Sequence, residues 1–178
     1  LHTDSTFLYA IPKNPSNLYD PLSYFLALGG KRMRPLLTIL SGELFGEKKE
    51  NLMPAAIAIE LFHNFSLIHD DIMDAAPLRR GKATVHEKWN SNSAILSGDV
   101  LLVKAYQLLS NYDAHKLSAL FLVFNKTAIE VCEGQQLDMD FEKRLIPAED
   151  TRKLTALWCS GAISGYTSGQ TMYHPTAK

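Results

Sequence analysis

The stretch from Ala55 to Met73 is apolar on almost every side of the helix that its composition favours. A helix without a polar face is buried on most sides, so other elements must pack around this one. The same stretch and the residue after it nevertheless carry ionisable side chains, at Glu60, His63, Asp70, Asp71 and Asp74. Because buried charges need partners, this helix is predicted to be the centre of both the fold and the functional site.

Three of these side chains, His63, Asp70 and Asp74, fall close to one line along the helix, with Asp71 beside them. Neighbouring carboxylates repel one another, and desolvating them without a partner is costly. The helix supplies no cation within reach, and Mg²⁺ takes one or two carboxylates plus phosphate oxygens of a substrate. The alternative is a solvated helix end, but negative charge there opposes the helix dipole. We therefore predict a metal site at Asp70, Asp71 and Asp74.

Helical periodicity recurs along the chain and strand signals are nearly absent, which predicts an all-α fold. Pro54 suits the first turn of the apolar helix. We expect helices at residues 21–28, 31–46, 54–73, 85–89, 93–109 and 114–141, and a loop at 79–81. The pattern weakens after Arg144, where glycines interrupt a helix that begins at residues 155–160. With 178 residues, 46% of them hydrophobic, the chain is expected to form one domain, residues 1–178.

Charge and cysteine content narrow the class of protein. A net charge of -1 gives no general reason to expect nucleic acid or an anionic membrane as a partner. The two cysteines, Cys132 and Cys159, form neither a disulfide framework nor a metal-ligand spacing, which favours the cytoplasm. We find no transmembrane run and no signal peptide. Because the chain begins at Leu1, native N-terminal residues are expected to be missing.

Two groups of basic residues offer sites for an anion. The Arg-Arg-Gly run at 79–81 closely follows Asp74; guanidinium groups suit phosphate oxygens, and glycine lets the backbone approach closely. The run from Gly29 to Pro35 places Lys31 and Arg34 at a helix start, where backbone N–H groups favour an anion. Either group alone is more often a solvated surface feature. Beside the acidic cluster, the two fit a diphosphate held partly by metal and partly by side chains.

The long helix expected at 114–141 has an apolar seam that becomes polar. Its apolar members recur at spacings of three and four: Phe121, Phe124, Ala128 and Val131. The same spacing continues to Gln135 and Asp138. Such polar groups either cap a core or line a cavity, and we favour the cavity, with Asp138 in reach of an arginine at 79–80.

Taken in order, these motifs resemble the trans-isoprenyl diphosphate synthases, the farnesyl, geranylgeranyl and longer polyprenyl diphosphate synthases. The resemblance covers roughly residues 17–142 and rests on five ordered runs: GGKRMRP at 29–35, residues 60–74 ending in DDIMD, LRRGK at 78–82, SGD at 97–99 and EGQ at 133–135. It implies a bundle of antiparallel helices around a central cavity, usually in a homodimer. It also implies a cytoplasmic prenyltransferase that joins isopentenyl diphosphate to an allylic diphosphate by magnesium-assisted ionisation.

The resemblance assigns roles to individual residues. Magnesium on the allylic diphosphate would be held by Asp70 and Asp74, with Asp71 in support. Isopentenyl diphosphate would be bound by a second set: Lys31, Arg34, His63 and Arg80. Arg79 would contact the allylic diphosphate, whose site Gln135 and Asp138 would line. The catalytic set would therefore comprise Asp70, Asp74, Arg79, Gln135 and Asp138.

Two neighbouring residues are implied to set product length. Phe65 and Ser66 precede Asp70 by five and four residues, about one helical turn deeper. In the resembling family, bulk at these positions blocks the cavity floor, so an aromatic followed by a small residue implies products of fifteen or twenty carbons. The alternative is that Phe65 is an ordinary core aromatic.

The sequence also departs from the family pattern. The family has a second aspartate-rich motif preceded by a Lys-Thr pair; nothing like it follows Asp150, and Lys153 and Thr155 are a loose echo. Family chains are also longer, so we expect a fragment or a sequence with omitted stretches, and the composition after Arg144 favours the latter. Ala83 stands where many relatives have proline.

Four other interpretations stay open. A longer-chain synthase would share every motif. A class I terpene cyclase uses one diphosphate and would not need Lys31 and Arg34. A non-catalytic partner subunit could lose the aspartates that are intact here. A metal-binding helical protein without prenyl chemistry would not need paired basic groups.

Overall fold

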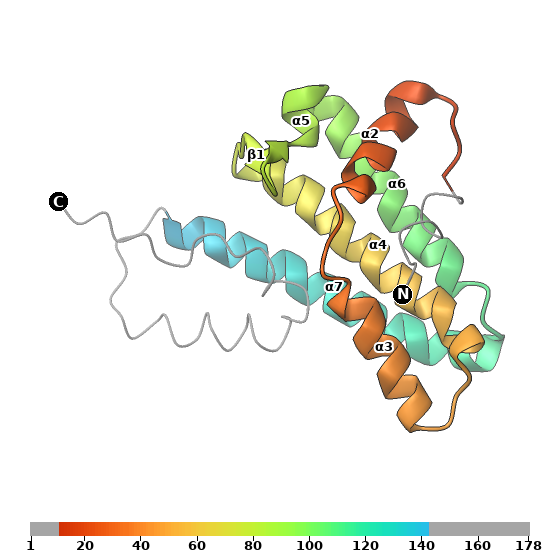
Figure 1. Ribbon diagram of the computed structural model, residues 1–178. Coiled ribbons are helices and arrows are strands. Elements are labelled where there is room, and N and C mark those ends of the chain that lie inside the picture. The colour runs from red at the N-terminus through yellow and green to blue at the C-terminus, as the bar shows by residue number, and fades with distance from the viewer. Residues whose placement is uncertain (1–10, 143–178) are drawn as a thin grey trace. The chain divides into compact units, whose positions relative to one another are not determined.

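The computed structural model describes residues 11–142, which are almost entirely helical (Figure 1). The helices are α2 (Ser16–Ala27), α3 (Met33–Leu44), α4 (Lys49–Met73), α5 (Val85–Lys88), α6 (Ser91–Leu109) and α7 (Ala114–Glu142). A short hairpin of β1 (Leu78–Arg79) and β2 (Lys82–Ala83) is the only sheet within these residues. The all-α prediction is confirmed. The chain divides after Asp113 into two compact units, and the single domain stays a prediction.

Helix α4 is the central element of the first unit. It packs against α6 and α3, which flank it in Figure 1, while α2 and α5 pack against α6. Its buried apolar residues form much of the core: Ala56, Ala58, Leu61, Phe62, Leu67 and Ile68. Within residues 11–142, α4 is also the one helix long and apolar enough to cross a membrane, yet half of its apolar window is buried, as in a core helix.

Both α2 and α4 begin five residues before the predicted starts, so Pro21 and Pro54 lie inside helices. Proline lacks an N–H and crowds the carbonyl four residues earlier. Next to Pro54, the Tyr112 hydroxyl accepts from the Ala55 N–H at 3.2 Å and donates to the Asn51 carbonyl at 2.6 Å. These two backbone groups are partners in a regular helix. The tyrosine thus supports α4 where the proline weakens it.

The predicted loop at 79–81 is instead the turn of the hairpin. Leu78 pairs with Ala83 and Arg79 with Lys82, which leaves a two-residue connection. Arg80 and Gly81 both have positive φ, at 53° and 74°, as a type I′ hairpin turn requires. The buried Thr84 then anchors the hairpin to the end of α4, because its hydroxyl donates to the Ala76 carbonyl at 2.7 Å.

Helix α3 begins at Met33 rather than near Lys31, because Arg32 has the left-handed backbone angles φ 49° and ψ 33°. Helix α6 starts at Ser91, where the Asn90 side chain caps it by accepting from the Ser93 N–H at 2.8 Å.

In the second unit, α7 spans the predicted range almost unchanged. The predicted helix at 155–160, Lys153, Thr155 and Cys159 lie outside the described residues.

Candidate active site

The acidic end of α4 closes in a defined helix cap. Asp74 is the cap residue, and its N–H donates to the Asp70 carbonyl at 2.9 Å. The Ala75 N–H then donates to Ile72 and the Ala76 N–H to Asp71, which is the Schellman pattern. Ala75 takes the left-handed position with φ 48°, where glycine is usual. The cap keeps Asp70 and Asp74 one helical turn apart at the end of the helix.

The environment of the Asp71 side chain differs from that of Asp70 and Asp74. Its side chain is 2% exposed, and both carboxylate oxygens accept from Arg79 Nε, at 2.8 and 2.9 Å. Burial raises the pKa of Asp71, and the Arg79 guanidinium opposes that rise. The helix itself supplies no cation, and the hairpin that follows it brings Arg79 back to the acidic cluster. The predicted contact of Arg79 with an allylic diphosphate stays a prediction.

Two arginines from each basic group converge on the buried His63. Burial, followed by the charges of Arg34, Arg80, Arg79 and Arg32 in that order, lowers the pKa of His63 to about 3. The charges of all four guanidinium groups therefore act on one imidazole. His63 is consequently neutral near pH 7 and offers a hydrogen bond rather than a charge. The structure brings the two basic groups together in the first unit.

The two basic groups are in direct contact at Gly30, which lies against Arg80. A Cβ added there would lie 3.2 Å from both terminal nitrogens of Arg80. The hairpin turn therefore sits against the segment before α3. Lys31 is exposed beside this contact, while Arg34 is 6% exposed and burial lowers its pKa to about 10.

A buried ion pair was missed at the sequence level. Arg32 Nη1 donates to Glu60 Oε1 at 2.6 Å, and Arg32 Nη2 donates to the Leu26 carbonyl at 3.1 Å. Asn64 Nδ2 in turn donates to the Glu60 carbonyl at 2.6 Å. The signal was available, because a carboxylate on an apolar helix needs a cation.

The end of α4 fits a magnesium site that a substrate completes. Among the residues that the structure describes, no three His, Cys, Asp or Glu side chains could together hold a metal ion. Asp70 and Asp74 supply two carboxylates one turn apart, and Mg²⁺ commonly takes one or two carboxylates plus phosphate oxygens and water. Asp71 differs from Asp70 and Asp74 because both of its carboxylate oxygens accept from Arg79 Nε.

The predicted chain-length residues are half-buried on α4. The Ser66 hydroxyl donates to the His63 carbonyl at 2.9 Å. The Phe65 ring centroid lies 4.6 Å from that of His69 and 5.8 Å from that of Phe62. Phe65 therefore belongs to a cluster of rings one to two turns before the aspartates, and its effect on product length stays a prediction.

The SGD run packs α6 against two neighbours. The buried Ser97 hydroxyl donates to the Leu18 carbonyl at 2.9 Å. A Cβ at Gly98 would lie 2.5 Å from His69 Nε2, and Asp99 Oδ1 lies 3.6 Å from the same nitrogen. The run thus joins α6 to α2 and to the end of α4.

Gln135 and Asp138 are half-buried on α7, in the second unit. Their place in an allylic site, and the pairing of Asp138 with an arginine, stay predictions.

Comparison with known proteins shows which proteins this chain is similar to. A family model described as polyprenyl synthetase matches residues 15–157. The geranylgeranyl diphosphate synthase of Methanosarcina mazei is 46% identical over 177 residues, covering 94% of this chain and 55% of that protein. A crystal structure of a geranylgeranyl pyrophosphate synthase is 51% identical with a TM-score of 0.80, covering 87% of this chain and 47% of that one. The geranylgeranyl pyrophosphate synthetase from Pyrococcus horikoshii is 38% identical with a TM-score of 0.81, covering 89% and 48%. The chain spans about half the length of these relatives.

Proposed function

The chain belongs to the polyprenyl synthetase family, and from that premise we propose that the protein is a trans-prenyltransferase. It condenses isopentenyl diphosphate with an allylic diphosphate and releases a product of fifteen or twenty carbons. The observation that carries the proposal is the convergence of four arginines from two separate segments on His63. His63 lies on the same helix as the carboxylates Asp70 and Asp74, so the first unit offers elements for two diphosphates.

The acidic end of α4 would bind the allylic substrate. Asp70 and Asp74 would hold Mg²⁺, with Asp71 keeping Arg79 and the hairpin in place. When bound, the ion supplies Lewis-acid stabilisation of the diphosphate as it leaves. Arg79 has a guanidinium edge beyond Nε that would face the same diphosphate. Gln135 and Asp138 would line this allylic site from α7.

The basic group would bind isopentenyl diphosphate through Lys31, Arg34 and Arg80, with neutral His63 as a hydrogen-bonding partner. Arginine forks match phosphate oxygens in pairs, which fixes the orientation of the ligand as well as its affinity. Orientation matters because the isopentenyl double bond must meet the allylic carbon as its C–O bond breaks. Loss of a proton then leaves a chain five carbons longer. Holding the two reactants together and excluding water supplies much of the rate.

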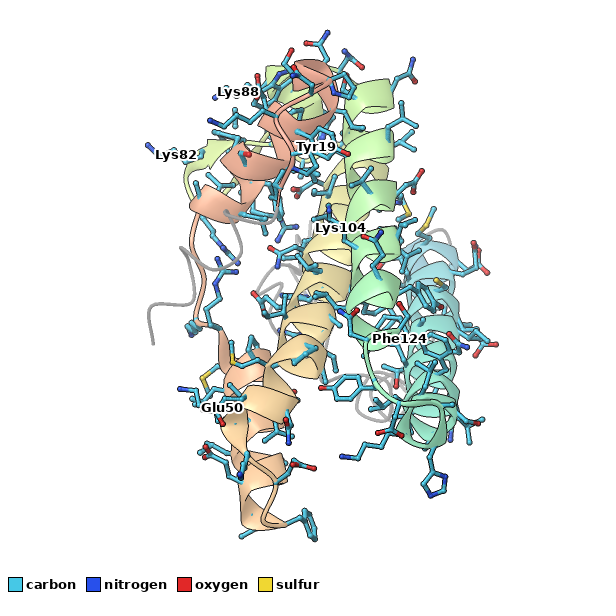
Figure 2. All side chains as sticks on the ribbon, turned by 90° about the vertical axis from the view of Figure 1, so that its right-hand side faces the viewer. Tyr19, Glu50, Lys82, Lys88, Lys104 and Phe124 are labelled. Atoms are coloured by element: carbon cyan, nitrogen blue, oxygen red, sulfur yellow. The ribbon has the colours of Figure 1, made fainter. Side chains whose placement is uncertain are left out.

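Product length would be set by Phe65 and Ser66, one to two turns away from the acidic end of α4. We further propose that the protein is a cytoplasmic homodimer. Exposed apolar side chains along α6, including Leu96 and Val103, support a second copy as the neighbour of that helix. A cavity of about 540 Å³ also opens there, and its lining includes Tyr19 and Lys104. Figure 2 labels these two side chains. Sedimentation of the purified protein would test the dimer.

The function is tested by incubating the full-length protein with labelled isopentenyl diphosphate, Mg²⁺ and allylic diphosphates of five, ten or fifteen carbons. The products are dephosphorylated and separated by chromatography. The proposal predicts labelled alcohols of fifteen or twenty carbons. Longer alcohols would identify a longer-chain synthase, and the absence of any labelled alcohol would refute the proposal.

A further inference from the structure

The segment that carries Lys31 and Arg34 has an unusual backbone. Gly29 has φ 77°, and Arg32 follows with φ 49° and ψ 33° at the cap of α3. The left-handed region is natural for glycine but disfavoured for a residue with a Cβ, because that atom approaches the carbonyl oxygen. Arginine at this position therefore requires other contacts to hold it there.

The Arg32 side chain provides those contacts. One terminal nitrogen donates to Glu60 Oε1 on α4, and the other donates to the Leu26 carbonyl in the last turn of α2. The two charged side chains are 10% and 5% exposed. A single guanidinium thus ties the segment before α3 to two other helices.

Glu60 is itself held in place and acts on more than one cation. Asn64 Nδ2 lies 3.3 Å from Glu60 Oε1 and also donates to the Glu60 carbonyl. Glu60 is close enough to Arg34 and to Arg80 to oppose the effect of burial on both. It therefore supplies negative charge inside a cluster of arginines that would otherwise repel one another.

We propose that Arg32, anchored on Glu60, is a positioning residue for the isopentenyl diphosphate site. It fixes the turn from which Lys31 and Arg34 extend, because its two terminal nitrogens donate to Glu60 and to the Leu26 carbonyl. The inference rests on the proposed function and adds to it a specific role for a residue that the motifs left unassigned.

The test compares Arg32→Asn, Arg32→Lys and Glu60→Gln in the full-length protein. Asparagine tolerates the left-handed backbone, so Arg32→Asn removes the guanidinium and keeps the turn. We expect this variant to raise the KM for isopentenyl diphosphate roughly 10-fold or more, as for outer partners that orient ligands elsewhere. The KM for the allylic diphosphate should stay unchanged. Glu60→Gln should have the same selective effect, and Arg32→Lys should recover part of the loss.

Tyr112→Phe serves as the matched control, because it weakens α4 at its other end without touching the basic group. It should lower the melting temperature and leave both KM values unchanged. The double variant Arg32→Asn/Glu60→Gln should cost less than the sum of the two single variants, since both break one contact.

The outcomes separate the inference from the proposed function. If the unmodified protein forms no prenyl product, the proposed function fails. If it is active and Arg32→Asn leaves the KM for isopentenyl diphosphate unchanged, or raises both KM values equally, the positioning role is overturned. Should Arg32→Asn not fold, Arg32→Lys decides, because one ammonium replaces two terminal nitrogens: a smaller rise in the KM for isopentenyl diphosphate alone is expected, and an unchanged KM or an equal rise in both KM values would overturn the positioning role.

Discussion

Arg79 donates from Nε to both carboxylate oxygens of Asp71, at 2.8 and 2.9 Å, across the turn that separates α4 from the hairpin. Only one edge of the guanidinium is engaged in this way. The contact fixes the direction of the hairpin, and with it the position of Arg80 against Gly30. The middle aspartate of the acidic cluster therefore organises the basic half of the site.

Removing one partner of this pair should be costly. We expect Arg79→Met to lower the free energy of unfolding by about 3–5 kcal/mol near pH 7, because it leaves a buried carboxylate without its cation. Burial already raises the pKa of Asp71, and without Arg79 that pKa rises further. A carboxyl group whose pKa is higher in the folded than in the unfolded state favours folding at low pH and loses that contribution as the pH rises.

Denaturant unfolding of both proteins at several pH values measures the stability deficit of Arg79→Met. The deficit of Arg79→Met should shrink as the pH falls towards 4, and the double variant Asp71→Asn/Arg79→Met should recover much of the loss. A deficit that does not depend on pH would contradict a charged Asp71 as its source.

His63 should make stability depend on pH in a second window. Its folded-state pKa is lowered to about 3, whereas the unfolded value is about 6.5. The unfolded chain therefore binds more protons between these values, and stability falls as the pH drops below about 6.5. From pH 6.5 to 5, the unmodified protein should lose up to about 1.4 kcal/mol per pH unit more than His63→Gln. Parallel pH curves for the two proteins would show that His63 titrates normally.

Replacing the alanine in the cap of α4 should stabilise the protein. Ala75 has φ 48°, a conformation that disfavours a Cβ and favours glycine. Ala75→Gly should raise the free energy of unfolding by about 1 kcal/mol. Ala76→Gly is the control, because its φ is not positive and glycine there adds only unfolded-state entropy. An equal gain in both variants would argue against strain at Ala75.

Substitutions of Phe65 and Ser66 on α4 should change the length of the product. Phe65→Ala removes a half-buried ring and should open space one to two turns from the aspartates, which would shift the products to longer chains. Ser66→Phe should shift them to shorter chains. Chromatography of the dephosphorylated alcohols measures both. An unchanged distribution in a folded, active Phe65→Ala would place the determinant elsewhere.

Local patterns predicted the elements of this protein, and distant partners determined what was missed. The apolar run of α4 and the two basic groups were recognised because their residues are neighbours in sequence. Arg32 and Glu60 are 28 residues apart, so no spacing rule connects them. The early start of α4 depends on Tyr112, 57 residues after Ala55.

The hairpin was missed for another reason. Its turn requires two residues with positive φ, and Arg80 fills a position where Asn, Asp or Gly is usual. Because the hairpin was not predicted, the contact of Arg79 with Asp71 was missed.

The most direct test of the account is the condensation rate of Asp70→Ala and Asp74→Ala with saturating isopentenyl and allylic diphosphates and Mg²⁺. Both carboxylates are assigned to the metal that stabilises the leaving diphosphate, so each change should lower turnover roughly 10²-fold or more. Excess chelator should abolish the activity of the unmodified protein. Normal turnover in either variant, or full activity in chelator, would contradict the role assigned to the end of α4.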